Sequence, residues 1–190
     1  MSKLLAFSGS LRKESTNTKT LAVAVRGAQS AGADVNTISL MDYELPLYNG
    51  DIEASDGIPQ NAAKLQELML ESDGFLIASP EYNSSITGAL KNMIDWTSRP
   101  NDGRSAGASF AGKSAALMSA SPGGLGGLRG LFDVRKILST MGVIVLPAQV
   151  AVSQSYTAFD ENGEIIDEKM RSQVEGLGAE LATFADQMNK

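Results

Sequence analysis

A run of hydroxyl and basic side chains near the amino terminus has the composition of a phosphate-binding loop. Residues 9–17 read Gly-Ser-Leu-Arg-Lys-Glu-Ser-Thr-Asn, between a short apolar run and a longer periodic one. Gly9 lets the backbone turn tightly, Arg12 offers a guanidinium that suits phosphate, and Asn17 can cap the helix that follows. A strand, a polar loop and a helix present free backbone N–H groups to an anion. We interpret this stretch as a phosphate cradle, although a capped turn with a solvated arginine explains the same residues equally well.

Two other polar loops follow apolar runs later in the chain, and their residues suit a flat heterocycle. Residues 79–88 include Tyr82, which offers aromatic surface, and Asn83, whose amide can hydrogen-bond to a ring edge. Residues 121–127 are rich in glycine, so their backbone N–H groups are open to a ligand. An exposed aromatic and a flexible connector explain the same residues, and Glu81 is more typical of a solvated or interface charge than of a catalytic base. Taken together, the three loops predict a planar cofactor that carries a phosphate group.

The composition of the chain argues against several classes of protein. Its 190 residues suit a single domain, which we place over residues 1–190. The formal net charge is −6 without a dense Lys/Arg run, which argues against nucleic-acid binding. No apolar run approaches the roughly 18 residues of a membrane-spanning helix, so we expect a cytoplasmic protein. Histidine and cysteine are absent, which removes the commonest general base and metal ligands. We therefore expect no metal site, and chemistry that a cofactor carries.

The periodicity of apolar residues predicts alternating strands and helices. Strands are expected over residues 4–7, 34–40, 74–78, 113–120 and 142–146. Helices are expected over residues 18–31, 59–72, 89–98, 128–141 and 167–188, with Pro59 in a first turn. A loop is expected over residues 41–56, and an extension over 147–157. This alternation predicts an α/β fold, a five-stranded parallel sheet with helices on both faces, which we take to be a doubly wound sheet of order 2-1-3-4-5. The three polar loops then meet at the carboxyl edge of the sheet, where such folds bind ligands.

Several motifs together resemble the NADPH-dependent FMN reductase family, a flavodoxin-like group that includes quinone, chromate and azo-dye reductases. The motifs are residues 9–17, 80–83, 90–96, 111–113 and 121–127. The resemblance runs from about Lys3 to the final helix. It implies a flavodoxin-like three-layer sandwich and an FMN that is bound without a covalent link.

The resemblance also implies a set of cofactor contacts and an assembly. The phosphate would bind the first loop, at Ser10, Arg12, Ser15, Thr16 and Asn17. The isoalloxazine ring would lie against the other two loops, at Pro80, Glu81, Tyr82, Asn83, Ser121 and Gly123. Members of the family are homodimers or homotetramers in which a partner chain walls the flavin site. We place an interface on residues 90–96, because Trp96 falls outside the apolar stripe there. Thr87 stands where many relatives have proline, which is expected to loosen the second loop.

The activity that the resemblance implies is that of an NAD(P)H-dependent FMN or quinone reductase. NADPH or NADH would pass hydride to FMN and leave, and a quinone, free flavin or similar small acceptor would then take the same place. This ping-pong turnover needs no acid or base from the protein. Two alternatives stay open, a flavodoxin-type one-electron carrier and a non-catalytic flavin sensor. Arg12 argues against the carrier, because flavodoxin phosphate loops typically lack arginine. A hydrolase of this fold would need a cysteine nucleophile or a metal cluster, and the sequence offers neither.

Overall fold

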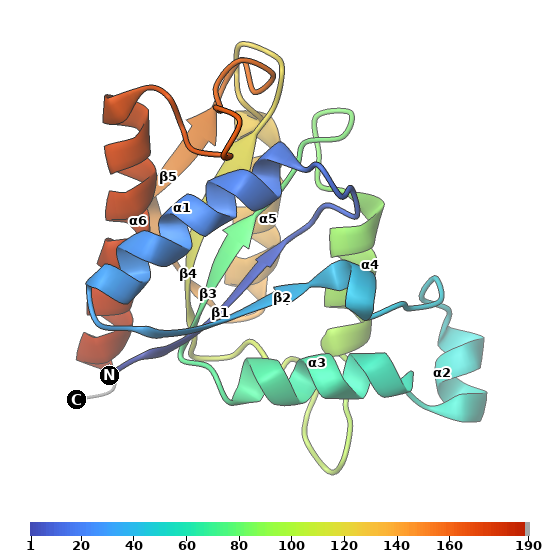
Figure 1. The fold of residues 1–190 in the computed structure, drawn as a ribbon. Coiled ribbons are helices and arrows are strands. Elements are labelled where there is room, and N and C mark those ends of the chain that lie inside the picture. Colours follow the sequence, from blue (N-terminus) through green and yellow to red (C-terminus); the bar gives the residue numbers. More distant parts are fainter. Residues whose placement is uncertain (189–190) are drawn as a thin grey trace.

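A computed structural model describes residues 1–188, in which five strands form one parallel sheet (Figure 1). The strands are β1 (Lys3–Ser8), β2 (Asp34–Ser39), β3 (Gly74–Ala78), β4 (Ser114–Ala120) and β5 (Ile144–Val152). Their order is β2-β1-β3-β4-β5, and each neighbouring pair runs parallel. The predicted α/β fold and its strand order are therefore confirmed. The last two residues of the predicted 1–190 domain lie outside the described residues.

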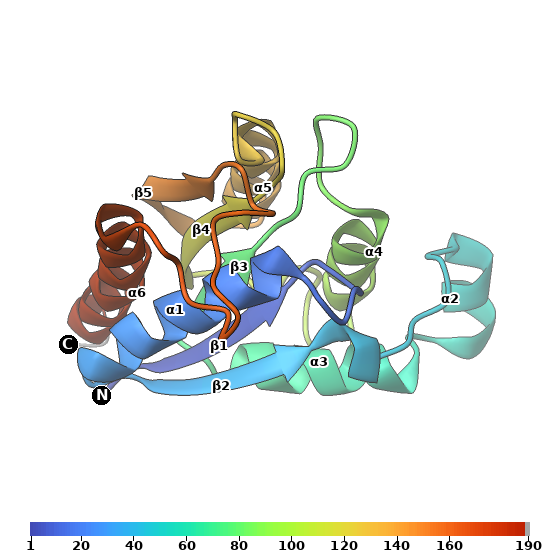
Figure 2. The ribbon, with the colours of Figure 1, turned by 45° about the horizontal axis from the view of Figure 1, so that its top comes forward.

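Helices cover both faces of the sheet, as predicted (Figures 1 and 2). One face carries α1 (Thr16–Ser30) and α6 (Glu168–Met188), and the other carries α3 (Gln60–Leu70), α4 (Gly88–Thr97) and α5 (Leu128–Thr140). Strand side chains alternate between the two layers, so Leu4 and Ala6 pack against the first pair of helices, whereas Leu5 and Phe7 pack against the other group. Within residues 1–188, no helix has the length and apolar character needed to cross a membrane.

The segment between β2 and α3 contains helical turns that the sequence analysis assigned to a loop over residues 41–56. A 3-10 turn spans Leu40–Asp42, and α2 spans Gly50–Asp56. Asn49 caps α2, and its side-chain oxygen accepts a hydrogen bond from the Asp51 N–H at 2.9 Å. The loop prediction is wrong here because a two-turn helix without a buried face shows no apolar period. Pro59 is the N-cap of α3 and not part of its first turn.

The strand β5 includes most of the segment predicted as an extension after residue 146. It is an edge strand that pairs with β4 alone, and its register shifts between Ala115 and Leu117 of β4. Pro147 lies in the part of β5 opposite this shift. Because proline has no N–H for the ladder, it is tolerated at edges and irregularities. Pro147 therefore interrupts the sequence pattern without ending the strand.

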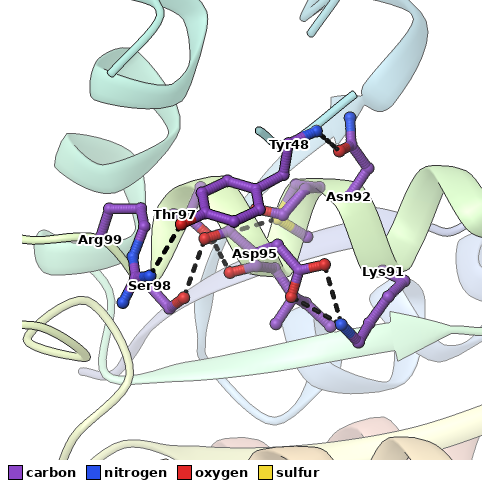
Figure 3. Close-up of polar contacts among 9 residues, drawn as sticks. Tyr48, Lys91, Asn92, Asp95, Thr97, Ser98 and Arg99 are labelled. Atoms are coloured by element: carbon purple, nitrogen blue, oxygen red, sulfur yellow. Dashed lines mark hydrogen bonds and ion pairs between the residues drawn. The ribbon is translucent and has the colours of Figure 1, made fainter. Parts of the chain in front are cut away.

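Trp96 is fully buried, so it does not offer the exposed surface for which an interface was placed on residues 90–96. The indole Nε1–H donates to the carbonyl oxygen of Pro46 at 2.8 Å, and the ring of Tyr48 meets the indole edge-on at 5.0 Å between centroids. Figure 3 shows how Tyr48 lies along α4, with its N–H bonded to Asn92 and its hydroxyl accepting from Arg99 at 3.1 Å. The segment after β2 thus folds back over α4 and covers the side that the sequence pattern leaves open.

Glycines bring α1 and α6 into close contact on their shared face of the sheet. A Cβ at Gly27 would lie 2.0 Å from the carbonyl oxygen of Glu175, and a Cβ at Gly178 would lie 1.9 Å from that of Ala24. No side chain fits at such distances, so both positions require glycine. This contact positions α1, which follows directly on the first polar loop.

Candidate functional site

The three polar loops meet at the carboxyl edge of the sheet, where β1 and β3 lie side by side. A cleft of about 140 Å³ opens at this point. The residues of the predicted set that line it are Ser10, Arg12, Ser15, Thr16, Asn17, Pro80, Glu81, Tyr82 and Ser121. Asn83 and Gly123, also in the predicted set, do not line it. The lining further includes residues that the sequence analysis did not single out, namely Glu14, Ala120, Pro122, Ser155 and Tyr156.

The first turn of α1 faces the cleft. Ser15 is the N-cap, and its hydroxyl oxygen accepts a hydrogen bond from the Thr18 N–H at 3.3 Å. The expectation that Asn17 caps this helix is therefore wrong, because the helix begins earlier, at Thr16. The first N–H groups of an α-helix have no acceptor within the helix. Those of Thr16 and Asn17 are available at the cleft, at the positive end of the helix dipole, which suits an anion.

Asn17 joins α1 to the end of β4. Its side chain is buried, with its Nδ2 donating to the carbonyl oxygen of Ala120 at 2.8 Å and its Oδ1 accepting from the Ala120 N–H at 2.9 Å. The side-chain amide therefore binds the protein backbone through both its oxygen and its nitrogen. This pair of bonds sets the first turn of α1 against the third polar loop.

Arg12 brings a positive charge to the cleft. Its side chain is exposed, and no ion pair among residues 1–188 includes it. The loop around it is shaped by its own serines, since Ser10 Oγ accepts from the Arg12 N–H and Ser8 Oγ accepts from the Ser10 N–H, each at 3.2 Å. Glu14 also lines the cleft and adds one negative charge. The hydroxyl groups of this loop and the free N–H groups of the first turn of α1 can donate hydrogen bonds, as a phosphate requires.

Thr87 ties the second polar loop to the first. It is buried, and its hydroxyl donates to the carbonyl oxygen of Gly9 at 2.6 Å while accepting from the Leu90 N–H at 3.1 Å. The expectation that Thr87 loosens the second loop is therefore wrong, because a proline at this place could make neither bond. Gly9 is held so close to α4 that a Cβ there would lie 3.0 Å from the Cβ of Leu90.

Glu81 joins the second polar loop to α5. Its side chain is only 7% exposed, and its two oxygens accept from Arg129 Nε at 2.9 Å and from the Gly130 N–H at 3.0 Å. Burial raises the pKa of the Glu81 carboxyl, but the bonds to Arg129 and Gly130 and the charge of Arg129 together hold that pKa below its ordinary value. Glu81 is thus an ionised carboxylate with both oxygens occupied, which favours a role in holding the loop over a role as a base.

The lowered pKa of Glu81 makes the stability of the protein depend on pH. The stabilising effect of this carboxylate is complete above its unfolded pKa and is lost as the pH falls through its lower folded pKa. We expect Glu81→Gln to remove this part of the acid dependence, about 1 kcal/mol because Arg129 is half exposed. Urea unfolding from about pH 7 to about pH 3 measures it. Glu14→Gln is the control and should keep the wild-type profile; identical profiles for wild type and Glu81→Gln would contradict the prediction.

The segment that follows β5 supplies a wall of the cleft that the sequence analysis missed. The Ser155 N–H donates to the carbonyl oxygen of Ser121 at 3.1 Å, which sets this segment beside the third polar loop. Tyr156 stands 77% exposed at the rim. The sequence offered a general indication of this wall, because every strand of a parallel sheet ends at the carboxyl edge, where ligands bind. The predicted strand ended at residue 146, however, so residues 155 and 156 were placed too far from the edge to be considered.

Comparison with known proteins shows the family to which the chain is similar. The chain matches the family described as NADPH-dependent FMN reductase over residues 2–157. It is 36% identical over 174 residues to an NAD(P)H-dependent FMN reductase of Pseudomonas aeruginosa, covering 91% of this chain and 89% of that protein. It is 32% identical over 180 residues to a quinone reductase of Escherichia coli K12, covering 94% of this chain and 90% of that protein.

Solved structures extend the likeness to the whole fold. The flavoenzyme NAD(P)H:(acceptor) oxidoreductase FerB of Paracoccus denitrificans superimposes with a TM-score of 0.82 at 28% identity, covering 98% of each chain. An archaeal flavodoxin superimposes with a TM-score of 0.63 at 14% identity, a likeness of fold alone. Because the family match covers most of the sequence, and the relatives align over nearly their whole length, this chain belongs to the NADPH-dependent FMN reductase family.

Proposed function

We propose that this chain is an FMN-dependent NAD(P)H oxidoreductase that reduces a quinone, a free flavin or a similar small acceptor. The observation that carries the proposal is the cleft at the carboxyl edge of the sheet, which joins the first turn of α1, Arg12 and the loops after β1, β3 and β4 in a chain of this family. The FMN reductase and quinone reductase relatives support NADPH or NADH as the donor and quinones among the acceptors.

FMN fits the polar groups that line this cleft. A phosphate needs positive charge and hydrogen-bond donors, which Arg12 and the N–H groups of Thr16 and Asn17 offer. The Ser15 hydroxyl accepts from the helix and keeps its own O–H to donate. Bound FMN supplies the hydride-transfer chemistry, which agrees with a chain that has no histidine and no cysteine.

The residues divide into two groups in this proposal. The phosphate is assigned to Ser10, Arg12, Ser15, Thr16 and Asn17, and the ring to Pro80, Glu81, Tyr82, Asn83, Ser121 and Gly123. Asn83 and Gly123 lie outside the cleft lining, so they would meet the ring beyond the mouth of the cleft. Glu81 acts mainly by fixing the second loop to Arg129, which keeps Pro80 and Tyr82 at the rim.

We also propose a homodimer or homotetramer in which a partner chain completes the flavin site. The cleft, about 140 Å³, is smaller than the roughly 300–1,000 Å³ of a typical ligand pocket, so it would enclose the phosphate end and only part of the ring. Tyr82, Leu125 and Tyr156 are each more than half exposed on the loops of this edge, and a second copy would cover them. We describe the whole chain as one flavin-binding domain, because the helices connect or follow the strands of a single sheet. The cytoplasmic location stays a prediction.

The test of the function is a visible absorption spectrum of the purified protein, reconstituted with FMN if needed, followed by NADPH without oxygen. We expect flavin absorbance that bleaches with NADPH or NADH and returns when a quinone is added. Free FMN at the same concentration is the control for reduction without the protein. Flavin absorbance that neither nicotinamide bleaches would contradict the reductase and favour the carrier or the sensor, and a protein that binds no FMN would overturn the proposal.

A further inference from the structure

The hydroxyl of Ser155 is a buried polar group without a partner. Ser155 is 2% exposed, and its Oγ makes no hydrogen bond to any of the residues 1–188. Nearly all buried polar atoms in folded proteins have a partner, because an unpaired one has lost its hydrogen bonds to water and gained nothing. The absence of a partner for Ser155 among residues 1–188 therefore points to a bound ligand as the missing acceptor or donor.

Ser155 lies where such a ligand would bind. It lines the same cleft as Arg12 and the first turn of α1, and the segment after β5 passes beside the N-terminal half of α1 (Figures 1 and 2). Its backbone is held in place, since its N–H bonds to Ser121 and the turn closes with a bond from the Thr157 N–H to the Gln154 oxygen at 2.9 Å. The backbone at Ser155 is thus fixed at the wall of the cleft before any ligand enters.

The groups around Ser155 select the chemistry of the ligand. Arg12 and the N–H groups of the first turn of α1 can only donate, and the acceptor Oδ1 of Asn17 is occupied by Ala120. Glu81, an acid of the same lining, has both oxygens bonded to α5. Apart from Glu14, whose carboxylate also lines the cleft, this set suits a ligand group that only accepts hydrogen bonds and is negatively charged, and a phosphate is such a group.

We propose that Ser155 is a further phosphate-binding residue, whose Oγ–H donates to a phosphate oxygen of FMN. This inference rests on the proposed function, since it takes FMN as the resident ligand. It adds the loop after β5 to the three loops that form the site. The hydroxyl that has no partner among the described residues gains its acceptor when the cofactor binds.

Ser155→Ala tests the inference through binding, without turnover. We expect the Kd for FMN, measured by quenching of flavin fluorescence on titration with the apoprotein, to rise about ten-fold or more, as the loss of a bond to a charged group predicts. The Kd for riboflavin, which has no phosphate, should stay as in wild type. The Tm of the apoprotein should stay the same or rise, because the variant removes an unpaired buried hydroxyl.

Ser153→Ala is the matched control, because Ser153 belongs to the same segment and does not line the cleft. It should bind FMN as wild type does. An unchanged Kd for FMN in Ser155→Ala would overturn the inference while the proposed function stands. An equal loss of FMN and riboflavin would overturn the assignment to phosphate. Wild-type protein that binds no FMN would overturn the proposed function and this inference with it.

Discussion

Gly178→Ala should destabilise the protein by about 3 kcal/mol or more, which is a large part of the total stability of a typical domain. The new Cβ would lie 1.9 Å from the carbonyl oxygen of Ala24 and 3.1 Å from the nitrogen of Ala28. Both atoms belong to the backbone of α1, so no side-chain rotation relieves the clash. The helices can accommodate the methyl group only by moving apart, which opens the apolar layer that they share with the sheet.

Helix α6, which contains Gly178, also offers a control variant whose expected effect on stability has the opposite sign. Gly176 is exposed, and a Cβ there would meet no atom within 4 Å. Gly176→Ala should stabilise the protein by about 1 kcal/mol, because alanine is the better helix former. Urea unfolding at equilibrium measures both variants. A Gly178→Ala variant as stable as wild type would mean that α1 and α6 do not touch at this place.

Asn17→Ala should cost about 3 kcal/mol and should also weaken FMN binding. The variant removes two hydrogen bonds to the backbone of Ala120. Ala120 is itself buried, so its N–H and carbonyl groups would be left without these partners. It also frees the first turn of α1 from the end of β4, so the N–H groups proposed to bind phosphate lose their fixed position. We expect the Kd for FMN to rise about ten-fold, measured by fluorescence quenching.

Asn17→Asp separates the role of this side chain in binding the Ala120 backbone from its effect on a ligand in the cleft. One carboxylate oxygen can still accept from the Ala120 N–H, but the other faces the carbonyl oxygen of Ala120, and the added charge lies at the cleft. If the cleft holds a phosphate, this variant should bind FMN more weakly than Asn17→Ala does, because like charges repel. Thr18→Ala, at an exposed position of the same turn, should behave as wild type. An Asn17→Asp variant that binds FMN better than Asn17→Ala would argue against phosphate at this place.

Local patterns in the sequence were sufficient to predict the alternation of strands and helices, the layers and the three polar loops at one edge of the sheet. The strand over residues 74–78 has the predicted bounds, because a strand buried on both faces is apolar throughout. The three polar loops were recognised from their composition, which is also a local property. Since parallel strands share one carboxyl edge, the place where these three loops meet followed from the topology alone.

The partners of individual side chains could not be predicted in this way. Asn17 was expected to cap its own helix, yet it binds Ala120, 103 positions away. Thr87 was expected to loosen its loop, yet it binds Gly9, 78 positions away. Trp96 was expected at an interface, yet a segment 50 positions away covers it.

The sequence by itself thus determined that five strands alternate with the helices that cover the sheet, and which loops gather at one edge, because these follow from apolar period, glycine and proline positions, and the geometry of parallel strands. Only the tertiary structure decided what each polar side chain binds, because a hydrogen bond depends on distances between groups that no local pattern relates. The missing partner of the buried Ser155 hydroxyl is one of the features that only the tertiary structure decided. Its lack of a partner appears only when every neighbouring element is in place.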